Sequence, residues 1–72
     1  MTPHWQDAPE WAHWLAQDQD GDWTWFEYEP DIVRGPIAFW STSEYGGLWE
    51  WARKSPLIAG WEITAYKRPD PL

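Results

Sequence analysis

Aromatic and polar residues alternate along two neighbouring segments of the chain, residues 11–17 and 23–29. This alternation, together with the enrichment in Trp, Phe, Tyr and Thr, favours β-strands. The linker between the segments contains Asp20-Gly21, a dipeptide typical of tight hairpin turns because glycine adopts a positive φ without steric cost. The pattern therefore predicts a β-hairpin that turns at Asp20-Gly21.

The position of this turn sets which residues face one another across the hairpin. The predicted pairs are Asp18–Trp23, Ala16–Trp25 and Leu15–Phe26. Because side chains alternate between the two faces of a strand, one face is predicted to carry His13, Leu15, Thr24, Phe26 and Tyr28. The opposite face is predicted to carry Trp14, Asp18, Trp23, Trp25 and Glu27. A shift of one residue would exchange the faces. Since both are aromatic, either both faces are covered or one is a contact surface.

A short helix is predicted over residues 43–54. Thr42 or Ser43 would cap its start, and Ser55-Pro56 would end it. Gly46 and Gly47 weaken this helix by about 1 kcal/mol each. The residues that would share its apolar face are Tyr45, Leu48, Trp49 and Ala52.

The other segments complete a single small domain, residues 1–72. Strands are predicted over 37–42 and 60–68, a loop over 30–36, an extended arm over 1–10 and a frayed tail over 69–72. The predicted fold class is therefore α+β, a small antiparallel sheet of three to four strands with one short helix.

The composition explains how so short a chain could hold a core. Its 72 residues include nine Trp and no Cys, so disulfides and thiolate zinc sites are excluded. An enclosed aromatic side chain buries about 150–250 Å². Most tryptophans are therefore expected in the core and two or three at the surface. No signal peptide or membrane-length apolar run is recognised, which predicts a cytoplasmic protein.

Charge is divided unevenly along the chain. Residues 1–31 contain eight acidic residues and no Lys or Arg, whereas residues 32–72 carry a net charge of +1, which together give the overall −7. Such a field repels nucleic acid and anionic membranes and attracts basic protein surfaces. The alternative is that the acidic residues only keep a Trp-rich protein in solution.

Part of the acidic turn matches the spacing of a calcium-binding loop. Asp18, Asp20, Asp22 and Glu29 occupy positions 1, 3, 5 and 12 of that pattern. However, the position that requires glycine is occupied by Trp23, and no flanking helices are predicted. The sequence therefore predicts a solvated turn and no metal.

Catalytic patterns are not recognised in the sequence. His4 and His13 have no Cys partners and no adjacent serine nucleophile. Glu27 and Glu29 would need a cleft for acid–base work, which a chain of this length rarely provides. We therefore expect a protein that is not an enzyme and has no cofactor.

The predicted protein-interaction surface is the acidic, aromatic hairpin. Its residues are Trp14, Asp18, Asp20, Asp22, Trp23, Trp25, Glu27 and Glu29. Trp23 and Trp25, framed by carboxylates, are expected to make the main contact. Alternatively these two tryptophans are core residues and the acidic side chains only solvate an edge. If the hairpin is not the interface, the basic strand with Lys67 and Arg68 is the better candidate. Whether the acidic row imitates a nucleic acid or simply occludes a partner stays open.

Residues 9–30 resemble small uncharacterised accessory proteins of tailed bacteriophages. The shared pattern is P-x-W-A-x-x-x-A-x-D-x-D-G-x-W-x-x-(F/Y)-E-x-x-P, and residues 61–64 and 67–69 fit a closing pattern that follows it in those proteins. The resemblance implies a phage accessory protein and brings no known activity.

The C-terminal third is also similar to the short-tailed coliphage inhibitor of host RNA polymerase. The similarity rests on Leu48-Trp49-Glu50-Trp51 and on the segment from Gly60 to Thr64. Members of that family are small cytoplasmic binding proteins, and their secondary-structure elements follow along the chain in the order hairpin, helix, strand. Where it has Arg after the Thr of the last strand, this chain has Ala65.

Together these features predict a phage-encoded, non-enzymatic protein that binds and inhibits a host bacterial protein. Candidate targets are host RNA polymerase, a defence nuclease complex or a DNA-repair enzyme. We expect the partner to present a basic surface, with no direct contact to nucleic acid or membrane. The protein itself would be a monomer or small homo-oligomer. The alternative is a structural or assembly component of the virion.

Overall fold

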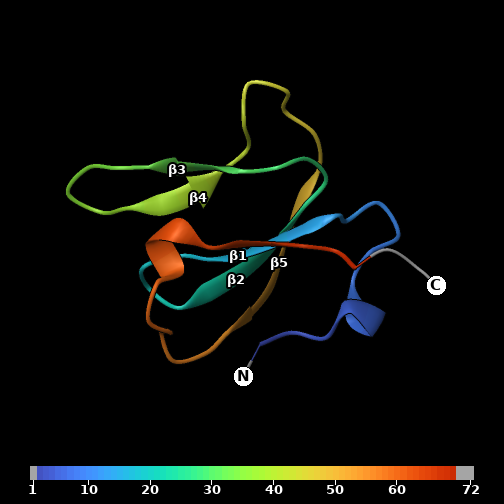
Figure 1. Ribbon diagram of the computed structural model, residues 1–72, viewed down its shortest axis with the longest axis horizontal. Helices are drawn as coiled ribbons and strands as arrows, with labels where there is room; N and C mark the ends of the chain where they lie inside the picture. The colour runs from blue at the N-terminus through green and yellow to red at the C-terminus, as the bar shows by residue number, and fades with distance from the viewer. Residues whose placement is uncertain (1, 70–72) are drawn as a thin grey trace.

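Six β-strands in two antiparallel sheets form the fold of residues 2–69, the part of the chain that the computed structural model describes (Figure 1). Two single-turn 3₁₀ helices complete it, and no α-helix occurs within this range. The elements are η1 (Trp5–Asp7), β1 (Trp14–Gln17), β2 (Asp22–Phe26), β3 (Asp31–Val33), β4 (Phe39–Ser41), β5 (Trp49–Lys54), η2 (Trp61–Ile63) and β6 (Ala65–Lys67).

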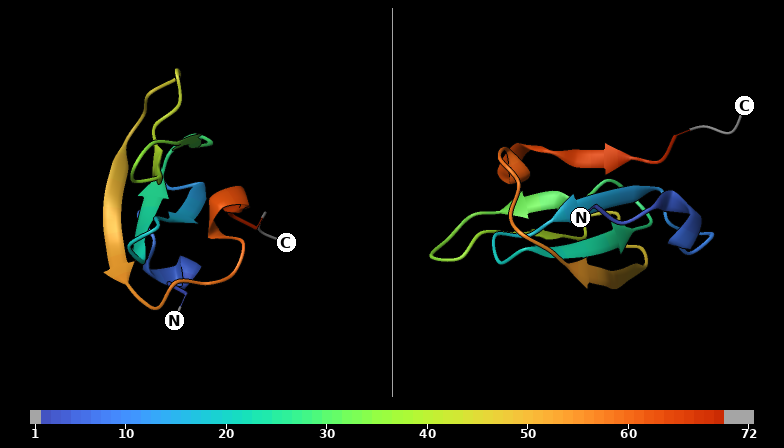
Figure 2. Two further views of the ribbon diagram at one scale, coloured as in Figure 1. Left: turned by 90° about the vertical axis from the view of Figure 1, so that its left-hand side faces the viewer. Right: turned by 90° about the horizontal axis from the view of Figure 1, so that it is seen from below.

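The larger sheet has four strands in the order β5-β2-β1-β6, and each neighbouring pair is antiparallel. β2 and β1 are therefore central, while β5 and β6 are edge strands. The left panel of Figure 2 shows β5 as the outermost strand on one side of the molecule. β3 and β4 form a separate two-stranded hairpin, which lies at the upper left of Figure 1.

The β1–β2 hairpin confirms the predicted pairing of the two aromatic segments, but the predicted register is wrong by one residue. Leu15 lies opposite Trp25, and Gln17 lies opposite Trp23. The cause is the length of the loop. Asp18 N–H donates to the Asp22 carbonyl at 2.8 Å, and Gly21 N–H donates to the Asp18 carbonyl at 2.9 Å. With φ of 96°, Gly21 is the left-handed last residue of a three-residue loop, not the centre of a two-residue turn.

The shift in register exchanges the faces of β2 and thereby sets the core. Leu15, Trp23 and Trp25 share one face and form the buried cluster together with Ala12. The partly buried residues packed against this cluster are Trp5, Ala8, Trp11, Ala52 and Ile58. The opposite face carries Trp14, Ala16, Thr24 and Phe26.

The N-terminal segment, predicted to be an extended arm, instead contributes to the core. η1 places the Trp5 ring 5.1 Å from the Trp25 ring, measured between centroids. The Arg68 guanidinium lies 5.9 Å from the centroid of the Trp5 ring, a cation–π distance. The same guanidinium donates to the Ala12 carbonyl at 2.9 Å. Residues near both ends of the chain thus close one side of the sheet.

The predicted helix over residues 43–54 is wrong, and with it the α+β class; the small antiparallel sheet is confirmed. Gly46 and Gly47 have φ of 69° and 91°, a conformation that a right-handed helix does not contain. A turn closed by Gly46 N–H and the Ser43 carbonyl at 2.9 Å stands there instead. The chain then continues as β5, which pairs with β2.

The remaining segments follow the prediction in part. The strand predicted over 37–42 is present as β4, whereas the predicted loop over 30–36 begins with β3. The strand predicted over 60–68 is divided into η2 and β6. Of the predicted tail, residues 70–72 lie outside the described residues.

Candidate functional site

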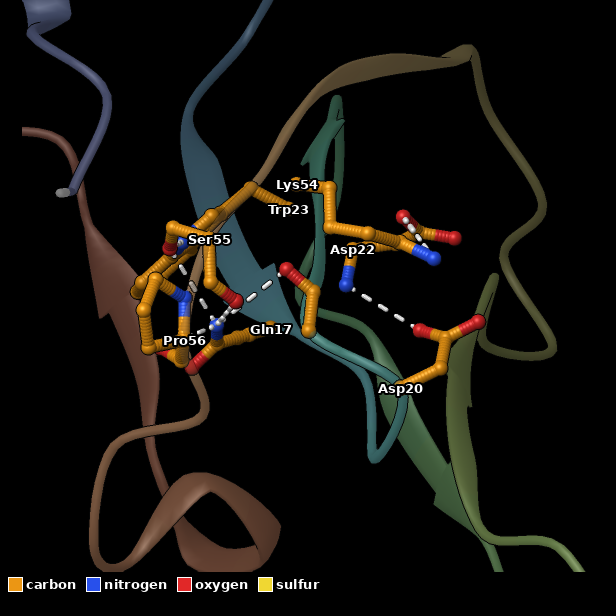
Figure 3. A network of polar contacts seen from close by, with 8 residues as sticks. Gln17, Asp20, Asp22, Trp23, Lys54, Ser55 and Pro56 are labelled. Atoms are coloured by element: carbon orange, nitrogen blue, oxygen red, sulfur yellow. Dashed lines mark hydrogen bonds and ion pairs between the residues drawn. The ribbon is translucent and has the colours of Figure 1, made fainter.

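A buried polar network beneath the β1–β2 hairpin is the most highly connected group of side chains (Figure 3). The Gln17 amide nitrogen lies 3.2 Å from the Gly21 carbonyl, 3.2 Å from the Ser55 carbonyl and 3.1 Å from the Pro56 carbonyl. Its amide oxygen accepts from Ile58 N–H at 3.2 Å. Trp23 Nε1 donates to Ser55 Oγ at 2.7 Å. These hydrogen bonds join the segment after β5 to the hairpin, so we assign the network a structural role.

Trp23 and Trp25, the expected centre of the contact surface, lie in the core instead. Their exposed fractions are 0% and 3%. The physical reason is the register of the hairpin, which places both residues on the face of Leu15, where the Trp25 ring meets Trp5 of η1 and the Trp23 ring meets Ser55 and Tyr66. Neither side chain is available to a partner in this fold, and the alternative placement of both residues in the core is confirmed.

The other predicted contact residues are not gathered on one surface. Trp14 is half-buried, and Asp20 is exposed at the hairpin loop, where its Oδ1 accepts from Asp22 N–H at 3.0 Å. Asp22 forms an ion pair with Lys54, with 3.7 Å between carboxylate oxygen and ammonium nitrogen. Glu27 Oε1 accepts from Leu48 N–H at 3.0 Å.

Glu29, the last of the predicted contact residues, lines a shallow acidic hollow at the far end of the hairpin. The hollow measures about 220 Å³, and its lining residues are Glu29, Asp31, Ser43, Glu44 and Tyr45. Within residues 2–69, no group of three His, Asp or Glu side chains is arranged to hold a metal ion.

Asp18 lies in a pocket between the β3–β4 hairpin and the four-stranded sheet. The pocket has a volume of about 290 Å³. Its lining residues are Asp18, Thr24, Phe26, Phe39, Trp40, Ser41, Thr42 and Trp49. Four of these side chains are aromatic, and Asp18 contributes the one carboxylate. We call this the Asp18 pocket.

Hydrogen bonds from the β1–β2 loop hold β4 in place and fix the Asp18 carboxylate. Asp18 Oδ1 accepts from Trp40 N–H at 2.7 Å, and Gln19 Oε1 accepts from Ala38 N–H at 3.1 Å. The Trp40 indole N–H donates to the Trp61 carbonyl at 3.1 Å. The carboxylate and the Trp40 side chain are thus positioned before any ligand arrives.

The environment of Asp18 raises the pKa of its carboxyl group above the ordinary value of 3.8. Burial is the largest cause, since it disfavours the charged form, and the nearby carboxylates of Asp20 and Asp22 add to it. The hydrogen bond from Trp40 N–H acts in the opposite direction. A positive charge in the pocket would stabilise the charged form of the Asp18 carboxylate.

The aromatic residues of this pocket were not identified from the sequence as site residues. Phe39 and Trp49 are exposed, Trp49 at 64% of its surface, and Trp51 on the same strand is exposed at 57%. The sequence signal for them is the alternation Trp49-Glu50-Trp51, which fits a strand as well as Tyr45, Leu48, Trp49 and Ala52 fit a helix. The expectation of two or three exposed tryptophans is confirmed by Trp49 and Trp51.

Comparison of the chain with protein-family models, with curated proteins and with solved structures finds no match. Within residues 2–69, no helix has the length and apolar character needed to cross a membrane.

Proposed function

We propose that the protein is a non-enzymatic binding protein that recognises a basic protein surface by accepting a Lys or Arg side chain in the Asp18 pocket. The observation that carries the proposal is the combination of four aromatic side chains and one fixed carboxylate in a single hollow. Aromatic faces attract cations, and a carboxylate forms charge-assisted hydrogen bonds with ammonium or guanidinium groups.

The charge of the chain supports a cationic ligand over a neutral one. The whole chain carries −7, and residues 1–31 contain no basic residue. Asp20 is exposed in the β1–β2 loop close to Asp18, and Glu29, Asp31 and Glu44 are exposed at the far end of the hairpin. Such a field speeds the encounter with a basic partner and lowers the rate of encounter with nucleic acid.

The biological role that we propose for this binding is that of a phage accessory protein acting in the bacterial cytoplasm. Support comes from the resemblance of residues 9–30 to accessory proteins of tailed phages. Inhibition of a host protein would follow from occupation of a basic surface that the host uses for another partner. The Asp18 pocket takes over the role first expected of Trp23 and Trp25, because it presents accessible aromatic rings.

A titration with small cations tests the pocket itself. We expect n-butylammonium to shift the NMR signals of the Trp40 amide and the Trp49 indole in a saturable manner. The neutral analogue 1-butanol, which has the same number of non-hydrogen atoms, should shift them much less. Asp18→Asn should abolish the difference between the two probes while preserving the fold, because the amide oxygen still accepts from Trp40 N–H. Asp20→Asn, which removes a neighbouring exposed charge, is the matched control.

The result that would overturn the proposal is equal binding of both probes, or cation-induced shifts that persist in the Asp18→Asn variant. A second experiment addresses the partner. Wild-type protein should capture a host protein from a bacterial lysate, capture should weaken as salt rises, and Asp18→Asn should reduce it about tenfold or more. Co-purification with phage particles instead would favour the role of a virion component.

A further inference from the structure

The outer edge of β5 is the longest unpaired strand edge in residues 2–69. β5 has six residues, pairs with β2 on one side only, and is the outermost strand in the left panel of Figure 2. An edge strand presents unpaired backbone N–H and C=O groups that can pair with another strand. Here the edge also presents Trp49 and Trp51, both more than half exposed.

The hydrogen bonds that flank β5 show which of its backbone groups face outward. The Leu48 carbonyl accepts from Glu27 N–H at 2.9 Å, and Ser55 N–H donates to the Gly21 carbonyl at 3.0 Å. Backbone N–H and C=O groups alternate in direction along an antiparallel strand. The backbone groups of Trp49 and Trp51 therefore point away from β2 at one end of β5, and those of Lys54 do so at the other end. The outward positions change from odd to even numbers because the strand contains a bulge at Ala52.

We propose that two copies of the chain pair through β5, antiparallel and about a two-fold axis between Trp51 and Ala52. In this register Trp49 of one copy lies opposite Lys54 of the other, so that two outward-facing residues meet. The bulge makes this pairing of Trp49 with Lys54 possible. In a strand without a bulge, the backbone groups of one of these two residues would point toward β2 and those of the other away from it. Trp49, Glu50, Arg53 and Lys54 of each copy are paired in this arrangement, and the bulges of the two strands meet at the axis.

Charge complementarity selects a second copy as the occupant of this edge. In the same register Glu50 lies opposite Arg53 of the other copy, and the two-fold axis produces this pair twice. Both side chains are exposed, and both lie on the same face of β5 because their partners on β2 are Trp25 and Trp23. Lys54 is already matched by Asp22 on its own chain, so it adds no unpaired charge to the interface.

Charge exchange tests the register directly. Sedimentation equilibrium should show a concentration-dependent dimer for the wild-type chain. Glu50→Arg and Arg53→Glu should each weaken dimerisation about tenfold or more, because each places like charges opposite one another twice. The double variant should restore dimerisation. An equimolar mixture of the two single variants should form mixed dimers more tightly than either variant alone.

Two control variants separate this pairing from a general effect of net charge. Glu62→Arg and Arg34→Glu make the same changes in charge at exposed positions outside β5, and both should dimerise as the wild type does. Hydrogen exchange at the Trp49 and Lys54 amides should slow as the protein concentration rises.

The proposal is overturned by a wild-type chain that stays monomeric at about 0.5 mM, since even weak specific pairs associate there. It is also overturned by a double variant that does not recover dimerisation, or by exchange at the Trp49 and Lys54 amides that is independent of concentration. The proposal does not depend on the function of the Asp18 pocket, because Glu50 and Arg53 do not line that pocket and Asp18→Asn leaves β5 unchanged.

Discussion

Trp23-Thr24-Trp25 and Trp49-Glu50-Trp51 have the same spacing, and β2 and β5 lie side by side in one sheet, yet their tryptophans differ completely in exposure. The first pair is buried, and the second is more than half exposed. The difference comes from position in the sheet. β2 is central and its rings are covered by η1 and by residues 55–58, whereas β5 is at the edge and opens onto solvent. Burial is therefore decided by what covers a strand and not by the pattern along it.

Truncation of one tryptophan from each pair should give the largest contrast. Trp23→Ala should lower the free energy of unfolding by about 3–5 kcal/mol, because it leaves a cavity in the core and removes the hydrogen bond to Ser55. Trp51→Ala should change it by only about 0.5 kcal/mol. Urea denaturation of both variants measures the difference. Similar losses in the two variants would contradict the comparison.

Gln17 sharpens the explanation for the burial of Trp23, because its amide holds the segment that covers the hairpin. Gln17→Leu should destabilise the fold by about 1–3 kcal/mol, since Ile58 N–H and the Ser55 and Pro56 carbonyls would lose a buried partner. Gln6→Leu, at an exposed position of η1, is the control. Retention of full stability by Gln17→Leu would show that packing alone covers Trp23.

The pH dependence of stability tests the environment on the other face of the hairpin. The pKa of Asp18 is raised in the folded state, so its contribution to stability is present below the ordinary pKa and is lost as the pH rises through the folded value. Relative to Asp18→Asn, the wild type should therefore be less stable at pH 7 than at about pH 4. Thermal unfolding of both proteins across this range measures the change. A wild type that instead gains stability over Asp18→Asn as the pH rises would contradict the assignment.

The smallest effect on stability should come with a clear change in fluorescence. Trp49→Phe and Trp51→Phe remove exposed indoles, so each should reduce the fraction of emission that acrylamide quenches while leaving the unfolding midpoint within a few degrees. Trp25→Phe should leave the quenchable fraction nearly unchanged. Quenching that is insensitive to residues 49 and 51 would place their side chains in a covered position.

Local patterns were sufficient to predict the hairpin, the β4 strand and the basic segment at β6. They were insufficient for the register of the hairpin, because Asp20-Gly21 fits both a two-residue turn and a three-residue loop that ends in glycine. The hydrogen bond from Gly21 N–H to Asp18 distinguishes the two. Residues 43–54 were misassigned because Tyr45, Leu48, Trp49 and Ala52 match a helix, while the positive φ of Gly46 and Gly47 excludes one.

The candidate site was predicted in one residue only, Asp18. Phe39, Trp40 and Trp49 join it through the packing of β4 and β5 against the first hairpin. Such contacts between distant segments depend on the three-dimensional arrangement of the sheets. No local pattern in the sequence records them, so the pocket is visible only in the folded chain.

The order of strands in the larger sheet has a consequence for how quickly the chain folds. Trp14 to Gln17 meet their hairpin partners across a short loop, but Leu15 also pairs with Tyr66, and Trp25 pairs with Glu50. Closing a long loop costs conformational entropy before the stabilising contacts have formed. Folding rates therefore fall as the mean sequence separation of contacting residues grows. The two hairpins are therefore expected to form early, and docking of β5 and β6 onto them to limit the rate. Kinetics of refolding from urea should show a transition state in which Leu15–Trp25 contacts are formed and the outer strands are still detached.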